Sequence, residues 1–191
     1  MEFRPAQIKN VWIGDSPVMR DTRGSFHEWF KASELPNSIR FNPVQANTSV
    51  SDKGVIRGIH FSNALEGQRK LLTCLSGSLM DFFVDLRKGS ETFLQWGSQL
   101  LTADSGVSIF LGEGIGHAFQ SLERGTQIVY LLDSEYQPQS ELSIYPFDED
   151  VNIEWPLAGH HLSDRDAKAP SVKTLLLQGN LPTIADQEFY L

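Results

Sequence analysis

Short apolar runs alternate with polar positions along most of the chain, and glycine, serine, asparagine or aspartate separate them. In residues 79–86 the even-numbered positions are all apolar, whereas the odd-numbered positions are Leu79, Asp81, Phe83 and Asp85. Successive side chains of a strand point to opposite faces, so this period predicts a strand with both acids on its less apolar face. No long stretch has the 3.6-residue period of a helix. The pattern therefore predicts a mainly β chain of short antiparallel strands, a sandwich or a jelly-roll barrel with short peripheral helices.

The boundaries of the expected elements follow from the same pattern. Ser76-Gly77-Ser78 is a turn signal between two strand-like runs. Residues 11–13 and 17–19 suit edge strands or an arm, residues 21–25 a turn, 31–40 a short helix or turn, and 171–177 a helix. We expect a single domain over 1–191, with a jelly-roll core at about 40–155, an N-terminal arm at 1–20 and a C-terminal tail at 171–191. Strands are expected at 43–50, 55–61, 71–75, 79–86, 94–101, 107–111, 127–132 and 142–145.

Composition narrows the class of protein. The 191 residues are 40% hydrophobic, which is enough to bury the core of one domain. The net charge of −8 argues against non-specific binding to nucleic acid or to an anionic membrane. The first 30 residues contain no signal-like apolar region and no apolar run reaches 18 residues, so we expect a cytoplasmic protein. Cys74 is the only cysteine, which excludes an internal disulfide and a cysteine-rich zinc site; we interpret it as a small apolar residue in a strand.

Residues 54–86 hold the first candidates for chemistry. Arg57 and His60 interrupt an apolar run, and Lys70 precedes the next one. We expect these three side chains and Asp81 to project from neighbouring strands, since titratable groups on rigid strands suit a preorganised small-molecule site. The alternative is a β-sandwich with ordinary surface charges.

Two of the five histidines stand beside glycines in strand-like surroundings. These are His60, after Gly58, and His117, after Gly116, and small neighbours let a ligand approach the backbone. We interpret His27, His160 and His161 as structural or solvated.

A metal site is disfavoured at His60. Metal-binding jelly rolls of the cupin class place two histidines one residue apart on a strand, whereas Gly58 and Ser62 occupy the positions two before and two after His60. Two histidines rarely suffice for a tight transition-metal site. We therefore expect neither a metal nor another cofactor.

Cations and tyrosines complete the candidates. Collected at one barrel mouth, the scattered arginines and Lys70 would neutralise a diphosphate, with bidentate contacts from arginine; singly, each is an ordinary surface residue. Tyr130 and Tyr136 offer a phenol that donates a proton and a ring that stacks, or are simply packed aromatics. The cations are Arg23, Arg57, Lys70 and Arg165.

Seven ordered segments resemble the dTDP-4-dehydrorhamnose 3,5-epimerase family over about residues 20–172. The resemblance implies a cupin-like jelly roll without metal, an isomerase, and a homodimer in which the N-terminal segment lends part of the site to the other subunit. The segments are DTRGSFHEWF (21–30), QANTSVSDKGVIRGIHF (45–61), QRKLLTCLSGSLMDFFVDLRKGSETFLQW (68–96), GEGIGHAFQSL (112–122), VYLLDSEYQPQSE (129–141), IEWP (153–156) and LSDRDAKAP (162–170).

The resemblance also implies a reaction and the residues that perform it. The family inverts C3 and C5 of a nucleotide-linked 4-keto-6-deoxy sugar, whose protons at these carbons are acidic because each lies α to the C4 ketone. His60 would be the base, oriented by Asp166, because a carboxylate beside an imidazole stabilises the imidazolium. Lys70 would stabilise the enolate oxygen, and Tyr130 would return a proton on the opposite face.

Binding residues follow from the same match. Tyr136 would stack on the thymine, and the others would surround the sugar, the diphosphate and the nucleoside. They are Arg23, Phe26, Glu28, Gln45, Asn47, Arg57, Lys70, His117, Glu141 and Arg165.

The sequence departs from the family pattern at some positions. Leu131-Leu132 follows Tyr130 where many members have Lys-Thr-Thr, and Ser62 stands where glutamine is frequent. The main prediction is conversion of dTDP-4-keto-6-deoxy-D-glucose to dTDP-4-keto-L-rhamnose. The alternatives are a mono-epimerase that inverts only C3 or C5 of an antibiotic-type dTDP-sugar, a non-catalytic sugar-nucleotide-binding cupin, and a metal-dependent cupin enzyme.

Overall fold

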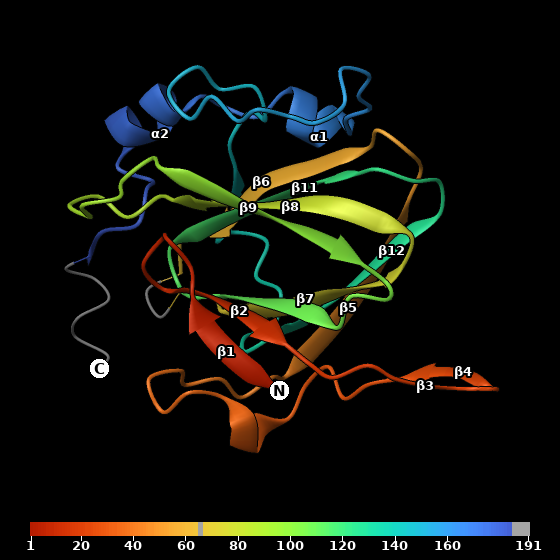
Figure 1. Ribbon diagram of the computed structural model, residues 1–191. Helices are drawn as coiled ribbons and strands as arrows, with labels where there is room; N and C mark the ends of the chain where they lie inside the picture. The colour runs from red at the N-terminus through yellow and green to blue at the C-terminus, as the bar shows by residue number, and fades with distance from the viewer. Residues whose placement is uncertain (65–66, 185–191) are drawn as a thin grey trace.

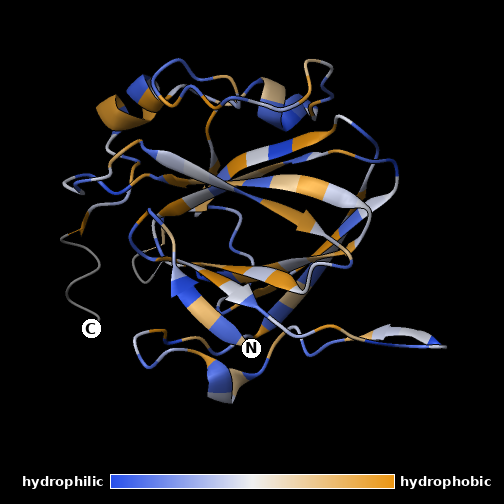
Figure 2. Cartoon of the chain, viewed as in Figure 1, coloured by the Kyte–Doolittle hydropathy of each residue, from blue (hydrophilic) through white to orange (hydrophobic). Residues whose placement is uncertain are grey.

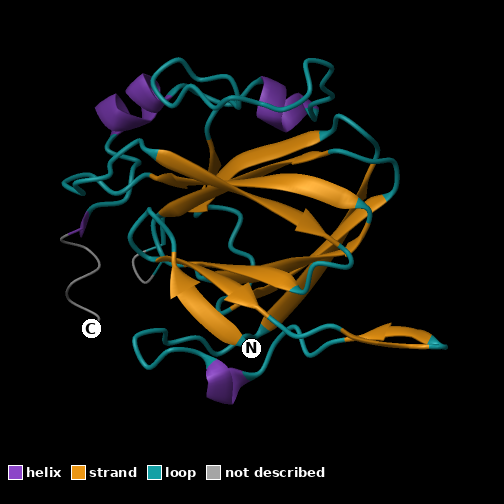
Figure 3. Ribbon diagram, in the orientation of Figure 1, coloured by secondary structure: helices purple, strands orange, loops and turns teal. Residues whose placement is uncertain are grey.

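The computed structural model describes residues 1–64 and 67–184, and its architecture is two antiparallel β-sheets that face each other (Figure 1, Figure 3). The six-stranded sheet has the order β1-β2-β10-β7-β12-β5, and the five-stranded sheet has the order β13-β6-β11-β8-β9. The strands are β1 (Glu2–Pro5), β2 (Val11–Asp15), β3 (Met19–Asp21), β4 (Gly24–Phe26), β5 (Gln45–Ser51), β6 (Ile56–Ser62), β7 (Lys70–Ser76), β8 (Ser78–Asp85), β9 (Trp96–Thr102), β10 (Val107–Leu111), β11 (Ile115–Ser121), β12 (Thr126–Leu132) and β13 (Glu141–Ser143).

Helices are short and lie outside the sheets. They are η1 (Ala32–Glu34), α1 (Asp164–Ala167) and α2 (Val172–Gln178). Figure 1 shows α1 and α2 on the outer side of the five-stranded sheet, while the β3–β4 hairpin projects from the molecule beyond the six-stranded sheet. The predicted mainly β, antiparallel jelly roll is confirmed, and so is a helix at the predicted 171–177. No described helix is long and apolar enough to cross a bilayer.

Alternation of side chains sorts the apolar residues into three layers, and the alternation is visible along the strands in Figure 2. One cluster fills the space between the sheets, with Leu72 and Ile128 from one sheet and Phe83 and Phe119 from the other. A second cluster packs the outer face of the five-stranded sheet against α2 and residues 144–155. A third lies between the six-stranded sheet and residues 29–41. Cys74 is buried in the inner cluster, as expected of a small apolar residue.

The less apolar face of β8, which carries both acids as predicted, does not face solvent. Asp81 and Asp85 are both fully buried. Asp85 accepts two hydrogen bonds from the guanidinium of Arg87, at 2.8 Å each, and Asp81 pairs with His117. Both faces of β8 are covered because the strand lies between the interior of the barrel and the outer apolar layer.

Three further differences concern the N-terminal arm, one central strand and one short helix. The predicted arm at 1–20 is wrong as far as Asp15, because β1 pairs with β2 and β2 pairs with β10 inside the six-stranded sheet. Strand β11 was not expected, since its glycine and histidine break the apolar pattern, and α1 is too short for a helical period. Within the predicted tail, residues 185–191 lie outside the described residues.

Candidate active site

A cavity of about 250 Å³ opens between the two sheets, and both sheets supply its walls. His60 of β6 and Glu141 of β13 come from the five-stranded sheet, whereas Asn47 of β5, Lys70 of β7 and Tyr130 of β12 come from the six-stranded sheet. The expectation that His60 and Lys70 lie on neighbouring strands is therefore wrong, because they face each other from opposite sheets. The lining residues are Asn47, His60, Gln68, Lys70, Tyr130, Leu132, Tyr136, Glu141 and Arg165.

His60 forms a hydrogen-bonded pair with Asp166 of α1, with 2.7 Å between Nε2 and Oδ1. Ser163 caps α1 by accepting a hydrogen bond from the Asp166 amide at 3.1 Å, which places the carboxylate against the imidazole. Burial raises the pKa of Asp166, but hydrogen bonds and charge from His60, together with bonds from Ser163 and Gly58, lower it further, so the net shift is downward. The carboxylate therefore stays ionised and supports a positive imidazole.

Lys70 places an ammonium group in a nearly closed environment, because the residue is only 8% exposed. Among the described residues the ammonium has no hydrogen-bond or ion-pair partner, although Glu141 lines the same cavity. Burial lowers the pKa of Lys70, and the charge of Glu141 opposes that shift. A cation with so little water around it interacts strongly with any negative charge that develops on a ligand.

Tyr130 and Tyr136 line the cavity from two different settings. Tyr130 is half-buried on β12 and packs against the inner core, whereas Tyr136 is 55% exposed in the loop after that strand. The Tyr136 amide donates to Oε1 of Gln45 at 2.8 Å, and Nε2 of Gln45 donates to Oδ1 of Asn47 at 3.0 Å. Gln45 and Asn47 thus share one side of β5 as predicted, but only Asn47 lines the cavity.

His117 lies directly opposite His60 in the pairing of β11 with β6. Its Nε2 is 2.7 Å from Oδ2 of Asp81, and the pair is buried. Burial raises the pKa of Asp81, which His117 partly offsets. The other carboxylate oxygen, Oδ1, has no hydrogen-bond partner in the described part of the chain. Asp81 therefore supports His117 from behind and does not reach the cavity lining, contrary to its expected place beside His60.

The glycines beside these histidines serve strand packing, which corrects the expectation that they leave room for a ligand. A Cβ on Gly58 would lie 2.6 Å from Cα of Ala118, and its φ of +125° disfavours any other residue. A Cβ on Gly116 would lie 2.8 Å from side-chain carbons of Ile59 and Leu86. The two positions let neighbouring segments approach closely.

Only some of the predicted cations lie at the cavity. Arg165 lines the cavity and donates through Nη2 to the Glu141 carbonyl at 3.0 Å. Arg57 is exposed, donates to Oγ of Ser51 at 3.1 Å, and lines a separate hollow of about 190 Å³ that also touches Asp166.

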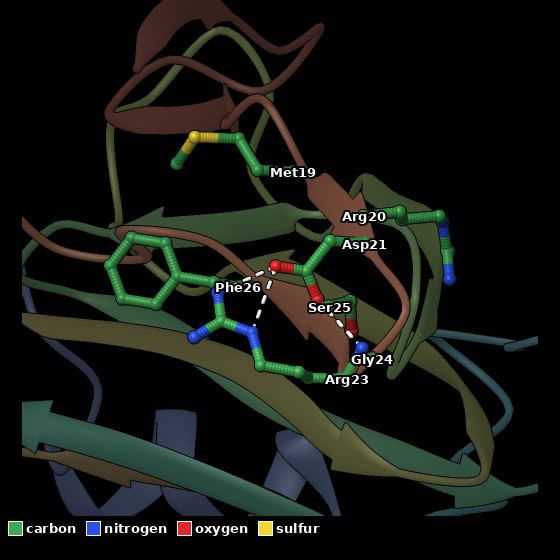
Figure 4. A pocket seen from close by; sticks show the side chains of 7 residues that line it. All are labelled: Met19, Arg20, Asp21, Arg23, Gly24, Ser25 and Phe26. Carbon is green, nitrogen blue, oxygen red and sulfur yellow. Dashed lines mark hydrogen bonds and ion pairs between the residues drawn. The ribbon is translucent and has the colours of Figure 1, made fainter.

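Arg23, Phe26 and Glu28, all predicted to bind substrate, lie away from this cavity. Arg23 and Phe26 belong to the β3–β4 hairpin, whose residues are all exposed (Figure 4). Nε of Arg23 donates to Oδ2 of Asp21 at 3.0 Å, and Phe26 is 62% exposed. A hollow of about 480 Å³ follows the hairpin, but none of its lining residues lines the cavity that holds His60.

Two lining residues, Gln68 and Leu132, were missed in the sequence. Each lies two positions from a residue that was singled out, since Gln68 precedes Lys70 and Leu132 follows Tyr130. Strand periodicity places such pairs on one face, so that signal was available. Among residues 1–64 and 67–184, no three metal-ligating side chains come together.

Comparisons with known proteins find similar sequences and similar structures. The profile of the family described as dTDP-4-dehydrorhamnose 3,5-epimerase matches residues 5–174. A dTDP-4-dehydrorhamnose 3,5-epimerase of Mycolicibacterium smegmatis is 41% identical over 100% of this chain and 96% of its own. The rmlC epimerase of Mycobacterium tuberculosis has a TM-score of 0.95 at 36% identity, covering 100% and 98% of the two chains. ChmJ, a 3'-monoepimerase of Streptomyces bikiniensis solved with dTDP-quinovose, has a TM-score of 0.93 at 36% identity, covering 100% and 96%.

Proposed function

The chain belongs to the dTDP-4-dehydrorhamnose 3,5-epimerase family of isomerases, and from this premise we propose which reaction its cavity performs and with which residues. The reaction is the conversion of dTDP-4-keto-6-deoxy-D-glucose to dTDP-4-keto-L-rhamnose, by inversion at C3 and C5. One observation carries the assignment of roles. His60, paired with Asp166, lies on one wall of the cavity, and Tyr130 lies on the opposite wall. A base and an acid on opposite sides of a sugar ring can invert a carbon between them.

Each inversion begins with removal of a proton. His60 takes the proton from C3 or C5, and the electron pair of the broken C–H bond moves to the C4 carbonyl oxygen, forming an enolate. Lys70 stabilises the negative oxygen, because its ammonium is buried in the cavity and unpaired among the described residues. Asp166 stabilises the imidazolium that results.

Reprotonation completes the inversion. Tyr130 donates its phenol proton to the other face of the carbon, and the enolate returns to a ketone. His60 is then protonated and Tyr130 is a phenolate, so one proton must pass between them through solvent before the next event. The same pair serves both carbons, because each lies α to the same ketone.

The nucleotide part of the substrate needs an aromatic surface and cations. Tyr136 is half-exposed at the cavity and offers a face for the thymine, with Gln45 fixing its backbone. Arg165 at the cavity and Arg57 close by supply positive charge for the diphosphate. These local positive charges allow an anionic diphosphate to bind although the net charge of the chain is −8. Glu141, which lines the cavity, and His117, which pairs opposite His60, are further proposed contacts.

The active form that we propose is a homodimer in which the β3–β4 hairpin of one subunit enters the cavity of the other. The hairpin is exposed throughout and carries Arg23 and Phe26, two predicted binding residues that lie outside their own chain's cavity. β5, which supplies Asn47 to the cavity, is an edge strand, and Val44 and Val50 are 54% and 61% exposed. A neighbouring subunit's hairpin can lie along that edge.

Mixing two inactive variants tests the exchange of hairpins. A subunit with His60→Ala keeps an intact hairpin, and a subunit with Arg23→Ala keeps an intact His60. If the hairpin acts across the dimer, a mixed dimer has one complete site, so mixing restores about a quarter of wild-type activity. No restoration in a sample that demonstrably exchanges subunits would place the hairpin in its own chain's site.

The mono-epimerase remains a second candidate because the chain is also similar to ChmJ, a 3'-monoepimerase. Turnover in deuterated water separates the two. Mass and NMR spectra of dTDP-4-keto-6-deoxy-D-glucose should show deuterium at both C3 and C5. Deuterium at one carbon would identify a mono-epimerase, and none would identify a binding protein. The cytoplasmic location stays a prediction.

A further inference from the structure

Arg69 precedes β7 and lies between two cavity-lining residues, Gln68 and Lys70, but it faces the other side of the strand. Its Nη1 is 2.9 Å from Oδ2 of Asp133 and its Nε is 2.9 Å from Oε2 of Glu113. Its backbone amide also donates to Oδ1 of Asp133 at 2.7 Å. The Asp133 carboxylate thus accepts hydrogen bonds from both the side chain and the backbone amide of Arg69.

Asp133 begins the loop 133–140 that connects β12 to β13, and the loop carries Tyr136. The Asp133 amide returns a hydrogen bond to the Arg69 carbonyl at 3.4 Å, and Gln68 Nε2 donates to Oγ of Ser134 at 3.2 Å. Gln45 then holds the Tyr136 amide at 2.8 Å. The loop is therefore anchored at its first two residues and again in its middle, and its far end leads into Glu141 of β13 at the cavity.

The charges of this anchor are shielded from solvent, which separates it from an ordinary surface ion pair. The side chains of Arg69, Asp133 and Glu113 are 23%, 11% and 12% exposed. Exposed ion pairs contribute little, but a partly buried arginine held by two carboxylates and a backbone bond is strongly ordered, and breaking it leaves buried charges unpaired. Removing the Arg69 side chain therefore loosens the start of the loop, which keeps only the main-chain bonds between Arg69 and Asp133 and the bond from Gln68 to Ser134.

We propose that Arg69 and Asp133 form a positioning clamp that holds the loop 133–140 so that Tyr136 faces the nucleotide end of the cavity. The proposal rests on the proposed function, since it takes the ligand to be a dTDP-sugar. Neither residue lines the cavity. The clamp is expected to set nucleotide affinity through Tyr136 and to leave the proton-transfer step unchanged.

A double-mutant cycle on dTDP binding tests this, with dTDP titrated against the intact protein in a calorimeter. Arg69→Met keeps a long apolar stem and removes the charge, and it should weaken dTDP binding about tenfold. Tyr136→Ala removes the stacking face and should also weaken binding about tenfold. If the clamp acts through Tyr136, the double variant binds as weakly as Tyr136→Ala alone. A loss of about a hundredfold in the double variant would mean independent effects and would overturn the clamp.

Two further measurements distinguish positioning from general stability. In Arg69→Met, KM for the dTDP-sugar should rise while kcat stays within about twofold of wild type. Arg87→Met is the matched control, because Arg87 makes a similar two-point contact with a carboxylate, that of Asp85, and does not touch the loop. It should lower the unfolding temperature and leave dTDP affinity unchanged. If Arg69→Met and Arg87→Met lost dTDP affinity equally, the effect of Arg69 would be one of general stability, and the proposed positioning role would be overturned.

Folding failure and failure of the proposed function are both distinguishable from failure of the clamp. If Arg69→Met does not fold, Asp133→Asn replaces it in the cycle, because the amide still accepts from the Arg69 backbone but loses its charge. A wild-type protein that does not bind dTDP at all would overturn the proposed function. If the wild-type protein binds dTDP but the two substitutions weaken binding independently, so that the double variant loses about a hundredfold, only the clamp would be overturned.

Discussion

His60 on β6 and Asp166 on α1 are 106 residues apart in the chain, and their side chains meet with 2.7 Å between Nε2 and Oδ1. Ser163 caps α1 by accepting a hydrogen bond from the Asp166 amide, in the same turn that holds the Asp166 carboxylate against His60. With Nε2 engaged by the carboxylate, His60 as the proposed base would act through Nδ1.

Replacing Asp166 with asparagine should slow proton removal while keeping the size of the side chain. The imidazolium loses its counter-charge, so we expect deuterium exchange at C3 and C5 to fall by about a hundred- to ten-thousandfold. Asp164→Asn on the same helix is the control, because Asp164 is exposed and should keep the wild-type rate. Exchange in Asp166→Asn within about threefold of wild type would show that His60 needs no carboxylate partner.

Replacing Tyr130 with phenylalanine should separate proton removal from inversion. The ring packing is kept and the donor is lost, so His60 still forms the enolate and returns the proton to the face it came from. Deuterium should continue to enter the substrate, while the inverted sugar forms about a hundred- to ten-thousandfold more slowly. NMR in deuterated water measures both rates in one sample. Inversion of both centres at the wild-type rate would mean that another group, or water, is the acid.

Activity should fall at high pH when Lys70 loses its proton. Burial lowers the pKa of Lys70 below the ordinary value of 10.5, and the charge of Glu141 opposes this. The ammonium that we propose to stabilise the enolate is therefore present at pH values below the shifted pKa and is lost above it. Glu141→Gln removes the opposing charge and should move the alkaline limb of the kcat profile to lower pH.

The control for the Lys70 experiment is Glu149→Gln, a change at an exposed acid outside the cavity lining. Its alkaline limb should coincide with that of the wild type. The electrostatic role of Glu141 would be contradicted if Glu141→Gln titrated at the wild-type pH or higher. A change in KM alone would instead indicate that Glu141 acts only as a substrate contact.

Turnover should survive removal of metal ions. Nε2 of His60 and Nε2 of His117 are each engaged by a different aspartate, and no three metal-ligating side chains cluster among residues 1–64 and 67–184. Two histidines held in this way make a poor transition-metal site. Extended dialysis against EDTA, followed by an assay and metal analysis, checks this. A stoichiometric metal whose removal stops turnover, and whose return restores it, would contradict the expectation.

Local features of the sequence predicted the strands and several of the residues that line the cavity. The alternating runs located most strands because consecutive side chains of a strand must point to opposite faces. The same periodicity placed Gln45 and Asn47 on one side of β5, and the family resemblance picked out His60, Lys70 and Tyr130, which line one cavity. Strand periodicity can be read locally because it depends on residues only a few positions apart, whereas the resemblance rests on seven segments spread over about residues 20–172.

Only the tertiary structure decided which faces are covered and which distant residues meet. Alternation separates the faces of β8, but Asp81 is buried because β8 lies between the barrel interior and an outer layer built from remote segments. Similarly, the sequence suggests that Gly58 leaves room for a ligand, but in the structure Ala118 of β11 packs against it. The clamp of Arg69 on Asp133 also depends on strand pairing 64 residues apart. Coverage and contact of this kind arise from packing between segments far apart in the chain, which no local period encodes.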